Sequence, residues 1–173
     1  MPAPQLSAAY PATDPMRRFT RPPLPLPLLL AACLALTGCG RGADTHPGQP
    51  VAKREAIFKR YLRTTEPMGM MLRGSKPFEA QRFQQLAATL KTLSTEPWQY
   101  FPVGSTYYPS RAKAAVWEKP AEFKAAQDRF TRAAAQLAEA TQRGNPDVIR
   151  PAFRQLSESC NACHHEFRGP PRF

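Results

Sequence analysis

The 173-residue sequence predicts an all-α fold, an antiparallel four-helix bundle, and three observations support this fold class. Four segments repeat apolar residues at intervals of three and four, which is the period of one helix face. Pro, Gly, Asn and Ser stand between these segments, where they start or stop helices. The connections between the segments are short, long and short, which suits antiparallel neighbours. We therefore expect one domain with one core in residues 51–173.

The first predicted helix covers Val51–Leu72. Its apolar face comprises Ile57, Phe58, Tyr61, Leu62, Thr65, Met68, Met71 and Leu72. Pro67 and Gly69 predict a kink or break near its end, because proline lacks the N–H that a helix interior needs. Gly74 is expected to stop this helix completely.

The second predicted helix follows at once. Ser75 and Pro77 resemble a helix start, and we expect the helix to end near Ser94. Its apolar face comprises Phe78, Phe83, Leu86, Leu90 and Leu93. Residues 95–119 then form a long segment rich in aromatic residues, and loops of this length often have a function. We expect this segment to cross over and pack against one end of the bundle, with a distinct binding loop as the alternative.

The last two helices have clear boundaries. Pro120 opens the third helix, and Gly144 is its C-terminal cap. The apolar face of the third helix comprises Phe123, Ala126, Phe130, Ala133, Ala134, Leu137 and Ala140. Asn145 and Pro146 form the cap and first turn of the fourth helix, and Pro151 is tolerated only near its start. The fourth helix carries Phe153, Leu156, Cys160, Cys163 and Phe167 along its length.

The fourth helix also carries a motif with a specific chemistry, Cys160-Asn161-Ala162-Cys163-His164. Two thiols at this spacing can both add to the vinyl groups of one haem, and the adjacent imidazole then becomes an axial ligand of the iron. A zinc site would need four ligands, which this chain cannot easily supply. A redox dithiol would require alternating strands and helices around the motif, and these are absent. The motif therefore predicts one covalently attached haem c.

The N-terminal 38 residues predict export. An apolar stretch from Leu24 to Leu36 follows three arginines, and it is too short and too rich in proline to span a membrane. Leu36-Thr37-Gly38-Cys39 resembles the lipobox of bacterial lipoproteins, so we expect lipidation at Cys39 and a short tether over residues 39–50. A plain secretory signal is the alternative. A twin-arginine signal is disfavoured, because the residues after Arg17-Arg18 fit that pattern poorly.

Charge and cysteine content agree with an exported protein. The signal contains three Arg and one Asp, so the net charge of +11 falls to +9 in the exported part. A basic surface suits acidic partner proteins or anionic lipid headgroups, although a solvated cationic face without a partner is equally compatible. No nucleic-acid-binding motif is present. With Cys33 removed, Cys39 lipidated and two thiols bound to haem, no cysteine is left for a disulfide.

A bundle with this motif on its last helix resembles the cytochrome c′ family over Val51–Arg168. The shared features are Arg54, Arg73-Gly74 before Pro77-Phe78, Phe101-Pro102-x-Gly104-Ser105, Val116-Trp117 with Phe123, and Arg168 four residues beyond His164. The resemblance implies one haem c, with His164 as the fifth iron ligand. It also places Arg54, Phe58 and Arg168 at the cofactor, with Phe58 facing the sixth position.

Phe58 departs from the pattern of the low-spin, electron-transferring members, which have Met at this position. High-spin members have an apolar residue, usually Leu, and phenylalanine likewise cannot ligate iron. Met68 lies ten residues further, about 15 Å along a helix, so we interpret it, Met70 and Met71 as packing residues. His165 should point away from the iron, and His46 lies in the tether. We therefore expect a five-coordinate iron closed off by Phe58.

Three functions follow as hypotheses. The first is binding of nitric oxide or a related diatomic gas, and the resemblance implies that nitric oxide can take the proximal position near Arg168. The second is electron transfer, in its strongest form as a low-spin, Met-ligated carrier. The third, a peroxidase, is disfavoured because no distal His with a neighbouring Arg is apparent, so we expect no enzyme. We expect a membrane-anchored periplasmic lipoprotein, and Gly40 favours the outer membrane. Dimerisation through the first two helices occurs in the family.

Overall fold

The computed structural model describes residues 43–171. The predicted signal, Cys39 and the start of the tether lie outside the described residues. The described part contains four long helices, α2 (Pro50–Leu72), α3 (Ala80–Leu93), α5 (Pro120–Ala140) and α6 (Pro146–Phe167). Three short helical segments accompany them, η2 (Glu96–Tyr100), α4 (Ala115–Glu118) and η3 (Thr141–Arg143). The all-α prediction is confirmed.

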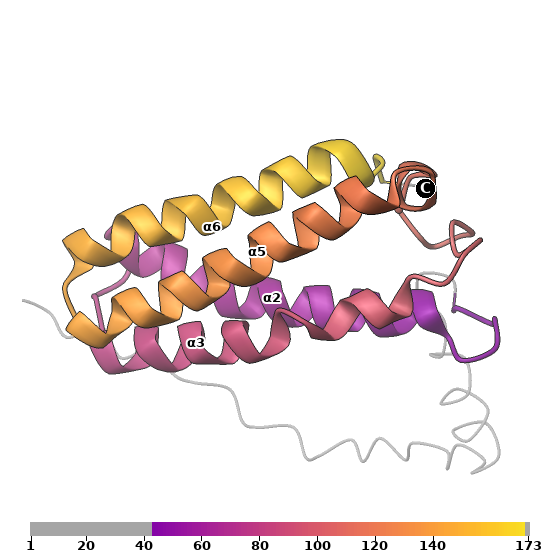
Figure 1. Ribbon diagram of the computed structural model, residues 1–173. Coiled ribbons are helices and arrows are strands. Elements are labelled where there is room, and N and C mark those ends of the chain that lie inside the picture. Colours follow the sequence, from indigo (N-terminus) through magenta and orange to yellow (C-terminus); the bar gives the residue numbers. More distant parts are fainter. Residues whose placement is uncertain (1–42, 172–173) are drawn as a thin grey trace, which may run out of the picture. The chain divides into compact units, whose positions relative to one another are not determined.

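The four long helices form an antiparallel bundle (Figure 1). Helix α2 packs against α3, α3 against α5, and α5 against α6. The turns from α2 to α3 and from α5 to α6 lie at one end of the bundle, and the long connection from α3 to α5 lies at the other end (Figure 1). The predicted order of short, long and short connections therefore gives the observed topology.

Helix α2 does not break at Pro67, where the sequence predicted a kink or break. It continues through Pro67 to Leu72, and the backbone N–H of Arg73 still bonds to the carbonyl of Gly69 at 3.0 Å. The side chains of Met68, Met71 and Leu72 in this last turn are buried in the core. Burial of three large apolar side chains offsets the one hydrogen bond that a proline removes, so packing overrides the local signal.

The start of α3 also differs from the prediction. The helix begins at Ala80, whereas Ser75 and Pro77 belong to the turn before it, and the residue that precedes the helix is Glu79. The end agrees, because Ser94 follows the last helical residue. Gly144 and Asn145 act as predicted. Gly144 has a positive φ of 61°, and the Asn145 side chain accepts a hydrogen bond from the Asp147 N–H at 2.8 Å.

Part of the predicted tether packs on the bundle. Asp44 is buried, and its carboxylate accepts hydrogen bonds from the backbone N–H groups of Val51 at 2.9 Å and Ala52 at 3.2 Å. These N–H groups lie in the first turn of α2, where the helix provides no partners for them. The His46 ring stacks on that of Tyr107, with centroids 3.3 Å apart. The chain is therefore held against the bundle from about residue 44.

Two apolar clusters fill the interior. The main cluster lies between the long helices and contains buried side chains of α2, α3, α5 and α6. A smaller one, the crossover cluster, consists of Val116, Phe123, Ala126 and Phe167. Trp98 packs against both clusters. Within residues 43–171, none of the helices has the length and apolar character needed to cross a membrane.

Candidate haem site

The two thiols of the motif lie on the last two turns of α6 and face different parts of the core. Cys160 packs against the main cluster, and Cys163 packs against the crossover cluster. Both are half-buried and free of disulfide bonds. One turn of helix therefore places the two sulfur atoms along the boundary between two apolar regions, where a large planar apolar group bound to both would be covered on two sides.

Burial keeps both thiols protonated. It raises the pKa of Cys160 to about 11, with a further contribution from the neighbouring Cys163. Burial also raises the pKa of Cys163, against an opposing effect of the Arg129 charge. A redox dithiol works through a thiolate of lowered pKa. These surroundings therefore argue against the dithiol alternative.

His164 follows in the last turn of α6, and the residue as a whole is exposed to solvent. Its pKa is lowered, first by desolvation of the ring and then by the positive charges of Arg168 and Arg111. The neutral imidazole is the form that binds a metal. Among the described residues no group of three or more His, Cys, Asp and Glu lies close enough together to hold a metal ion.

Phe58 lies on α2 within a group of aromatic rings. Its centroid is 5.5 Å from that of Tyr61, 6.1 Å from Trp98 and 6.4 Å from Phe101, all in edge-to-face geometry. Phe58 packs against the same main cluster as Cys160, yet it is only half-buried. An aromatic ring held by three neighbours has little freedom to move aside. The polar atoms of these rings have partners of their own, since the Tyr61 hydroxyl donates to the Leu93 carbonyl at 2.9 Å and the Trp98 ring N–H donates to the Ser94 carbonyl at 2.8 Å.

Phe58 and the thiols come from two long helices that do not pack closely against each other. Helices α2 and α6 complete the bundle, but they make almost no close backbone contact, whereas α2 with α3, α3 with α5, and α5 with α6 are extensively packed. Phe58 comes from α2, and Cys160, Cys163 and His164 come from α6. Two thiols, an imidazole and an apolar ring at the sparsely packed side of a bundle fit a covalently bound haem.

Arg54 is buried, and its guanidinium is occupied by the crossover segment, which we define as residues 97–117. One terminal nitrogen donates to the Tyr100 carbonyl at 2.8 Å and the Ser105 hydroxyl at 2.7 Å. The other donates to the Ser105 carbonyl and the Ser110 hydroxyl, both at 2.6 Å. Its guanidinium carbon also lies 4.4 Å from the centre of the Phe101 ring. Arg54 thus connects α2 to the segment that carries Phe101.

Arg168 lies just beyond the last turn of α6, near a second arginine that the sequence did not single out. Arg111 donates from two nitrogens to the Gly169 carbonyl, at 3.0 and 2.7 Å. Its charge and that of Arg168 both lower the pKa of His164. No signal in the sequence could have identified Arg111, because it reaches the motif only when residues 111–113 pair with the chain end at Phe167 and Gly169.

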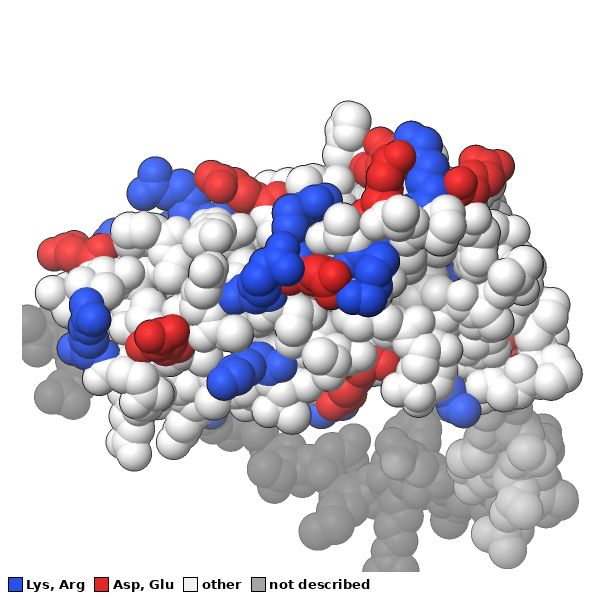
Figure 2. Space-filling model, in the orientation of Figure 1, with Lys and Arg blue, Asp and Glu red and all other residues white. Residues whose placement is uncertain are grey.

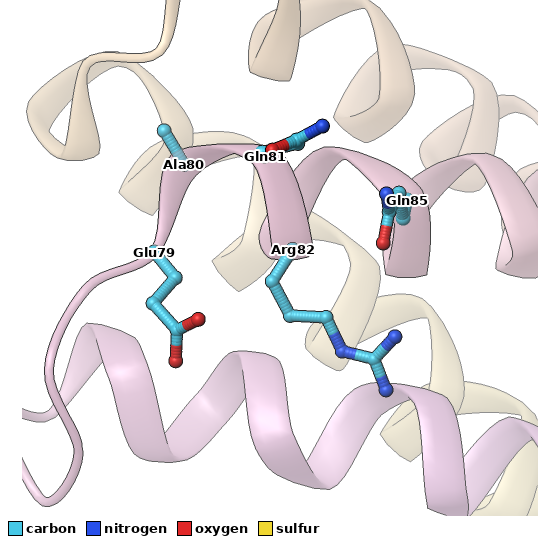
Figure 3. A pocket seen from close by; sticks show the side chains of 5 residues that line it. All are labelled: Glu79, Ala80, Gln81, Arg82 and Gln85. Carbon is cyan, nitrogen blue, oxygen red and sulfur yellow. The ribbon is translucent and has the colours of Figure 1, made fainter.

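The methionines and the two surface hollows are the remaining candidates for part of the site. Met68 and Met71 are buried in the main cluster near the C-terminal end of α2, as expected for packing residues. A hollow of about 400 Å³ lies at the start of α3, where Glu79 and Arg82 extend from the same side of the helix (Figure 3). A second hollow of about 280 Å³ lies between α5 and α6 beside Ala162. Neither is lined by the thiols, His164 or Phe58.

Comparison with known proteins identifies the family. A family model for cytochrome c′ matches residues 49–168. The cytochrome c′ of Rubrivivax gelatinosus is 31% identical over 123 residues, which cover 70% of this chain and 95% of the relative. That of Alcaligenes xylosoxydans is 33% identical over 101 residues, which cover 58% of this chain and 78% of the relative.

Solved structures agree. The cytochrome c′ of Shewanella frigidimarina superimposes with a TM-score of 0.70 at 31% identity, covering 73% of this chain and 98% of that one. The Alcaligenes protein superimposes with a TM-score of 0.67 at 28% identity, covering 73% and 98%. It was solved with carbon monoxide bound in a leucine-to-glycine variant, and with nitric oxide bound in an arginine-to-lysine variant. This chain belongs to the cytochrome c′ family, whose members carry one covalently bound haem c.

Proposed function

We propose that this protein is an exported haem c protein that binds nitric oxide or a related diatomic gas at a five-coordinate iron. Cys160 and Cys163 are the thioether attachment points, and His164 is the axial ligand. Haem iron supplies both gas binding and one-electron chemistry. The observation that carries the proposal is Phe58, a side chain without a ligating atom in a group of three aromatic rings.

Phe58 determines access on its side of the haem. Its ring is supported by Tyr61, Trp98 and Phe101, so an incoming gas molecule must displace a bulky side chain with few alternative positions. The Tyr61 hydroxyl donates to the Leu93 carbonyl at 2.9 Å and is therefore not directed at a bound gas. A pocket without a hydrogen-bond donor gives little help to dioxygen, which becomes partly negative when bound, and excludes nitric oxide and carbon monoxide only sterically.

The relatives support gas binding as the activity. The Alcaligenes protein was solved with nitric oxide bound in variants in which one leucine is replaced by isoleucine or alanine, and with carbon monoxide bound when leucine is replaced by glycine. We assign Phe58 to the place of that leucine, and Arg168 to the place of the arginine whose lysine variant was solved with nitric oxide. Arg168 would then act on the face of the haem that carries His164, together with Arg111.

Arg54 acts on the site through its neighbours. It holds Tyr100, Ser105 and Ser110 of the crossover segment and stacks on Phe101. Phe101 in turn contacts the Phe58 ring. Arg54 is therefore a positioning residue for the ring over the iron, in addition to the cofactor contact that the family resemblance implies.

Electron transfer is the second candidate function. The observation that favours it is the excess of basic residues, with 24 Lys and Arg against 13 Asp and Glu in the chain, which suits docking to an acidic redox partner. A Met-ligated low-spin iron would be the best carrier, and the described positions of Met68 and Met71 in the core speak against that ligand. An enzymatic role would require acid–base groups beside the iron, and the one hydroxyl among the rings around Phe58, that of Tyr61, donates to the Leu93 carbonyl instead.

The proposed location is the periplasmic face of a membrane, with a lipid at Cys39. The support is the Leu36-Thr37-Gly38-Cys39 pattern and a motif whose haem is attached after export. A homodimer through α2 and α3 remains a proposal from the family resemblance alone.

Optical spectra of the purified holoprotein test the proposed function. The ferric and ferrous forms are recorded before and after addition of nitric oxide and of carbon monoxide. We expect a high-spin spectrum that changes with both gases. Sharp low-spin ferrous bands that do not change with carbon monoxide would overturn the proposal and make a sixth protein ligand, and hence electron transfer, the leading function.

A further inference from the structure

The crossover segment exposes large apolar side chains to solvent. Val103 has 89% of its surface exposed and Tyr108 has 51%. Two of the four exposed large apolar side chains in the described chain thus lie five residues apart, at one end of the bundle. Scattered apolar residues on a surface are ordinary, but two that project from one short segment can meet the same apolar partner.

The charge of this segment is one-sided. From Pro97 to Trp117 there is no Asp or Glu, and the two charged residues, Arg111 and Lys113, are basic. Both bind backbone carbonyls, Arg111 that of Gly169 and Lys113 that of His165 at 2.8 Å. Within residues 43–171 neither forms an ion pair with a carboxylate. Figure 2 shows an uncharged area at this end of the visible face, with acidic and basic side chains together along its upper edge and further charged side chains over α5 and α6.

The segment is held firmly at several points. Arg54 donates to Tyr100, Ser105 and Ser110. The chain from Arg111 to Lys113 pairs with the end of α6, with the Gly169 N–H bonding to the Arg111 carbonyl at 2.7 Å. Val103 and Tyr108 project between these anchors. Their exposure is therefore built into the fold, and little conformational entropy would be lost when they are covered.

The same end of the bundle receives the N-terminal chain. Asp44 binds the first turn of α2, and His46 stacks on Tyr107 of the crossover segment. Cys39 precedes Asp44 by five residues, which can span at most about 18 Å. A lipid at Cys39 would therefore hold the crossover end of the bundle close to the bilayer.

We propose that the crossover segment is a membrane-docking surface for anionic phospholipid. Val103 and Tyr108 enter the interface between headgroups and acyl chains, and the exposed Lys113 faces the phosphate groups. Aromatic and apolar side chains flanked by cations are the combination that binds this interface. Docking turns the end of α6 that carries Cys163 and His164 towards the membrane. The surface is defined by described residues, and a lipid at Cys39 adds an anchor without being required for it.

The test uses the processed holoprotein with one added cysteine that carries an environment-sensitive fluorophore. Val103→Cys reports on the docking surface, and Gln142→Cys, exposed at the opposite end of the bundle, is the matched control. Each is mixed with phosphatidylglycerol vesicles whose acyl chains are brominated or unbrominated. The ratio of the two intensities cancels quenching by the haem, because the haem is present in both.

We expect bromine to quench the label at position 103 strongly, as for a group about 5–10 Å deep in the interface, and to leave the label at 142 unchanged. Phosphatidylcholine vesicles should reduce the quenching, and Lys113→Gln should weaken binding to anionic vesicles roughly fivefold. Equal fluorescence ratios for the two labels on vesicle-bound protein would overturn the proposal. The protein would then be held by its own lipid alone, or the exposed surface would serve a protein partner. Absence of any binding to anionic vesicles would overturn it as well.

Discussion

Arg54 donates to both the hydroxyl and the carbonyl of Ser105, at 2.7 and 2.6 Å, across 51 positions of sequence. This pair ties the first helix of the bundle to the longest connection between the described helices. Burial lowers the pKa of Arg54, and the nearby carboxylates of Glu55 and Asp44 and the phenol of Tyr107 partly offset this effect. Because the pKa of an arginine is ordinarily so high, the guanidinium of Arg54 stays charged despite this decrease. A buried cation satisfied by carbonyls and hydroxyls holds the crossover segment in place.

Replacing Arg54 with Met should destabilise the holoprotein by about 3 kcal/mol, because several buried oxygen acceptors lose their donor. Chemical denaturation followed by circular dichroism measures the change. Arg60→Met is the matched control, since Arg60 lies on the same helix and forms an exposed ion pair with Glu96 at 3.0 Å. That pair should be worth less than about 1 kcal/mol. Equal losses in the two variants would contradict the anchoring role of Arg54.

Replacing Asp44 with Asn should cost about 1 kcal/mol at neutral pH, because a carboxylate at a helix N-terminus is replaced by a neutral group. Burial of Asp44 raises the pKa of its carboxyl, but the N–H groups of His46, Ala52 and Val51 outweigh burial and keep this pKa below its usual value. A lowered pKa stabilises the fold above the unfolded value of about 4, and this contribution is lost as the pH falls through the folded value. The stability difference between the two proteins should therefore shrink below about pH 4. A stability difference that stays constant between roughly pH 3 and 7 would contradict the role of the Asp44 carboxylate.

Replacing Phe58 with Ala should speed carbon monoxide binding to the ferrous protein at least about tenfold, which corresponds to a barrier lowered by about 1.4 kcal/mol. The reason is removal of the ring that Tyr61, Trp98 and Phe101 hold in place. Stopped-flow mixing gives the rate. Leu62→Ala is the control, because Leu62 lies one turn further on α2 and is 62% exposed. Unchanged kinetics in Phe58→Ala would remove Phe58 from the gating role.

Replacing Phe58 with Met should convert the site towards six-coordinate, low-spin iron, because a thioether is then present at the position that faces the iron. Ferrous spectra should gain sharp bands, and the affinity for carbon monoxide should fall. The same substitution at the neighbouring exposed position, Leu62→Met, should leave the spectrum as it is. A high-spin spectrum in Phe58→Met would mean that position 58 lies away from the iron.

Replacing either Cys160 or Cys163 with Ala should leave haem attached through one thioether, and replacing both should remove covalent haem. Haem staining after denaturing electrophoresis distinguishes these states, and the absorption of the pyridine adduct distinguishes one from two thioethers. Cys39→Ala is the control, because it removes a thiol that lies outside the motif and should retain the stain. Haem retained covalently in the double variant would disprove the assignment of the attachment site.

The sequence was sufficient for the helical fold and for the identity of the cofactor. Apolar periodicity, Gly144 and Asn145 predicted the third and fourth helices to within a few residues, because helix geometry and capping are local interactions. The spacing of Cys160, Cys163 and His164 is equally local, since all three lie within two turns of one helix. The predicted break at Pro67 failed because core packing around Met68, Met71 and Leu72 carries helix α2 past the proline. Helix α3 begins at Ala80, three residues later than Pro77 indicated.

Tertiary structure decided everything that depends on contacts between distant segments. It placed Arg54 on Ser105 and Ser110, brought Arg111 to the end of α6, and gathered Tyr61, Trp98 and Phe101 around Phe58. It also attached Asp44 to the bundle and left Val103 and Tyr108 exposed. No sequence periodicity or local motif predicts these contacts, because each depends on how the helices pack and on how the long connection covers one end of the bundle. The chain's own pattern thus determines which helices form and which cofactor they bind, and packing determines what surrounds that cofactor.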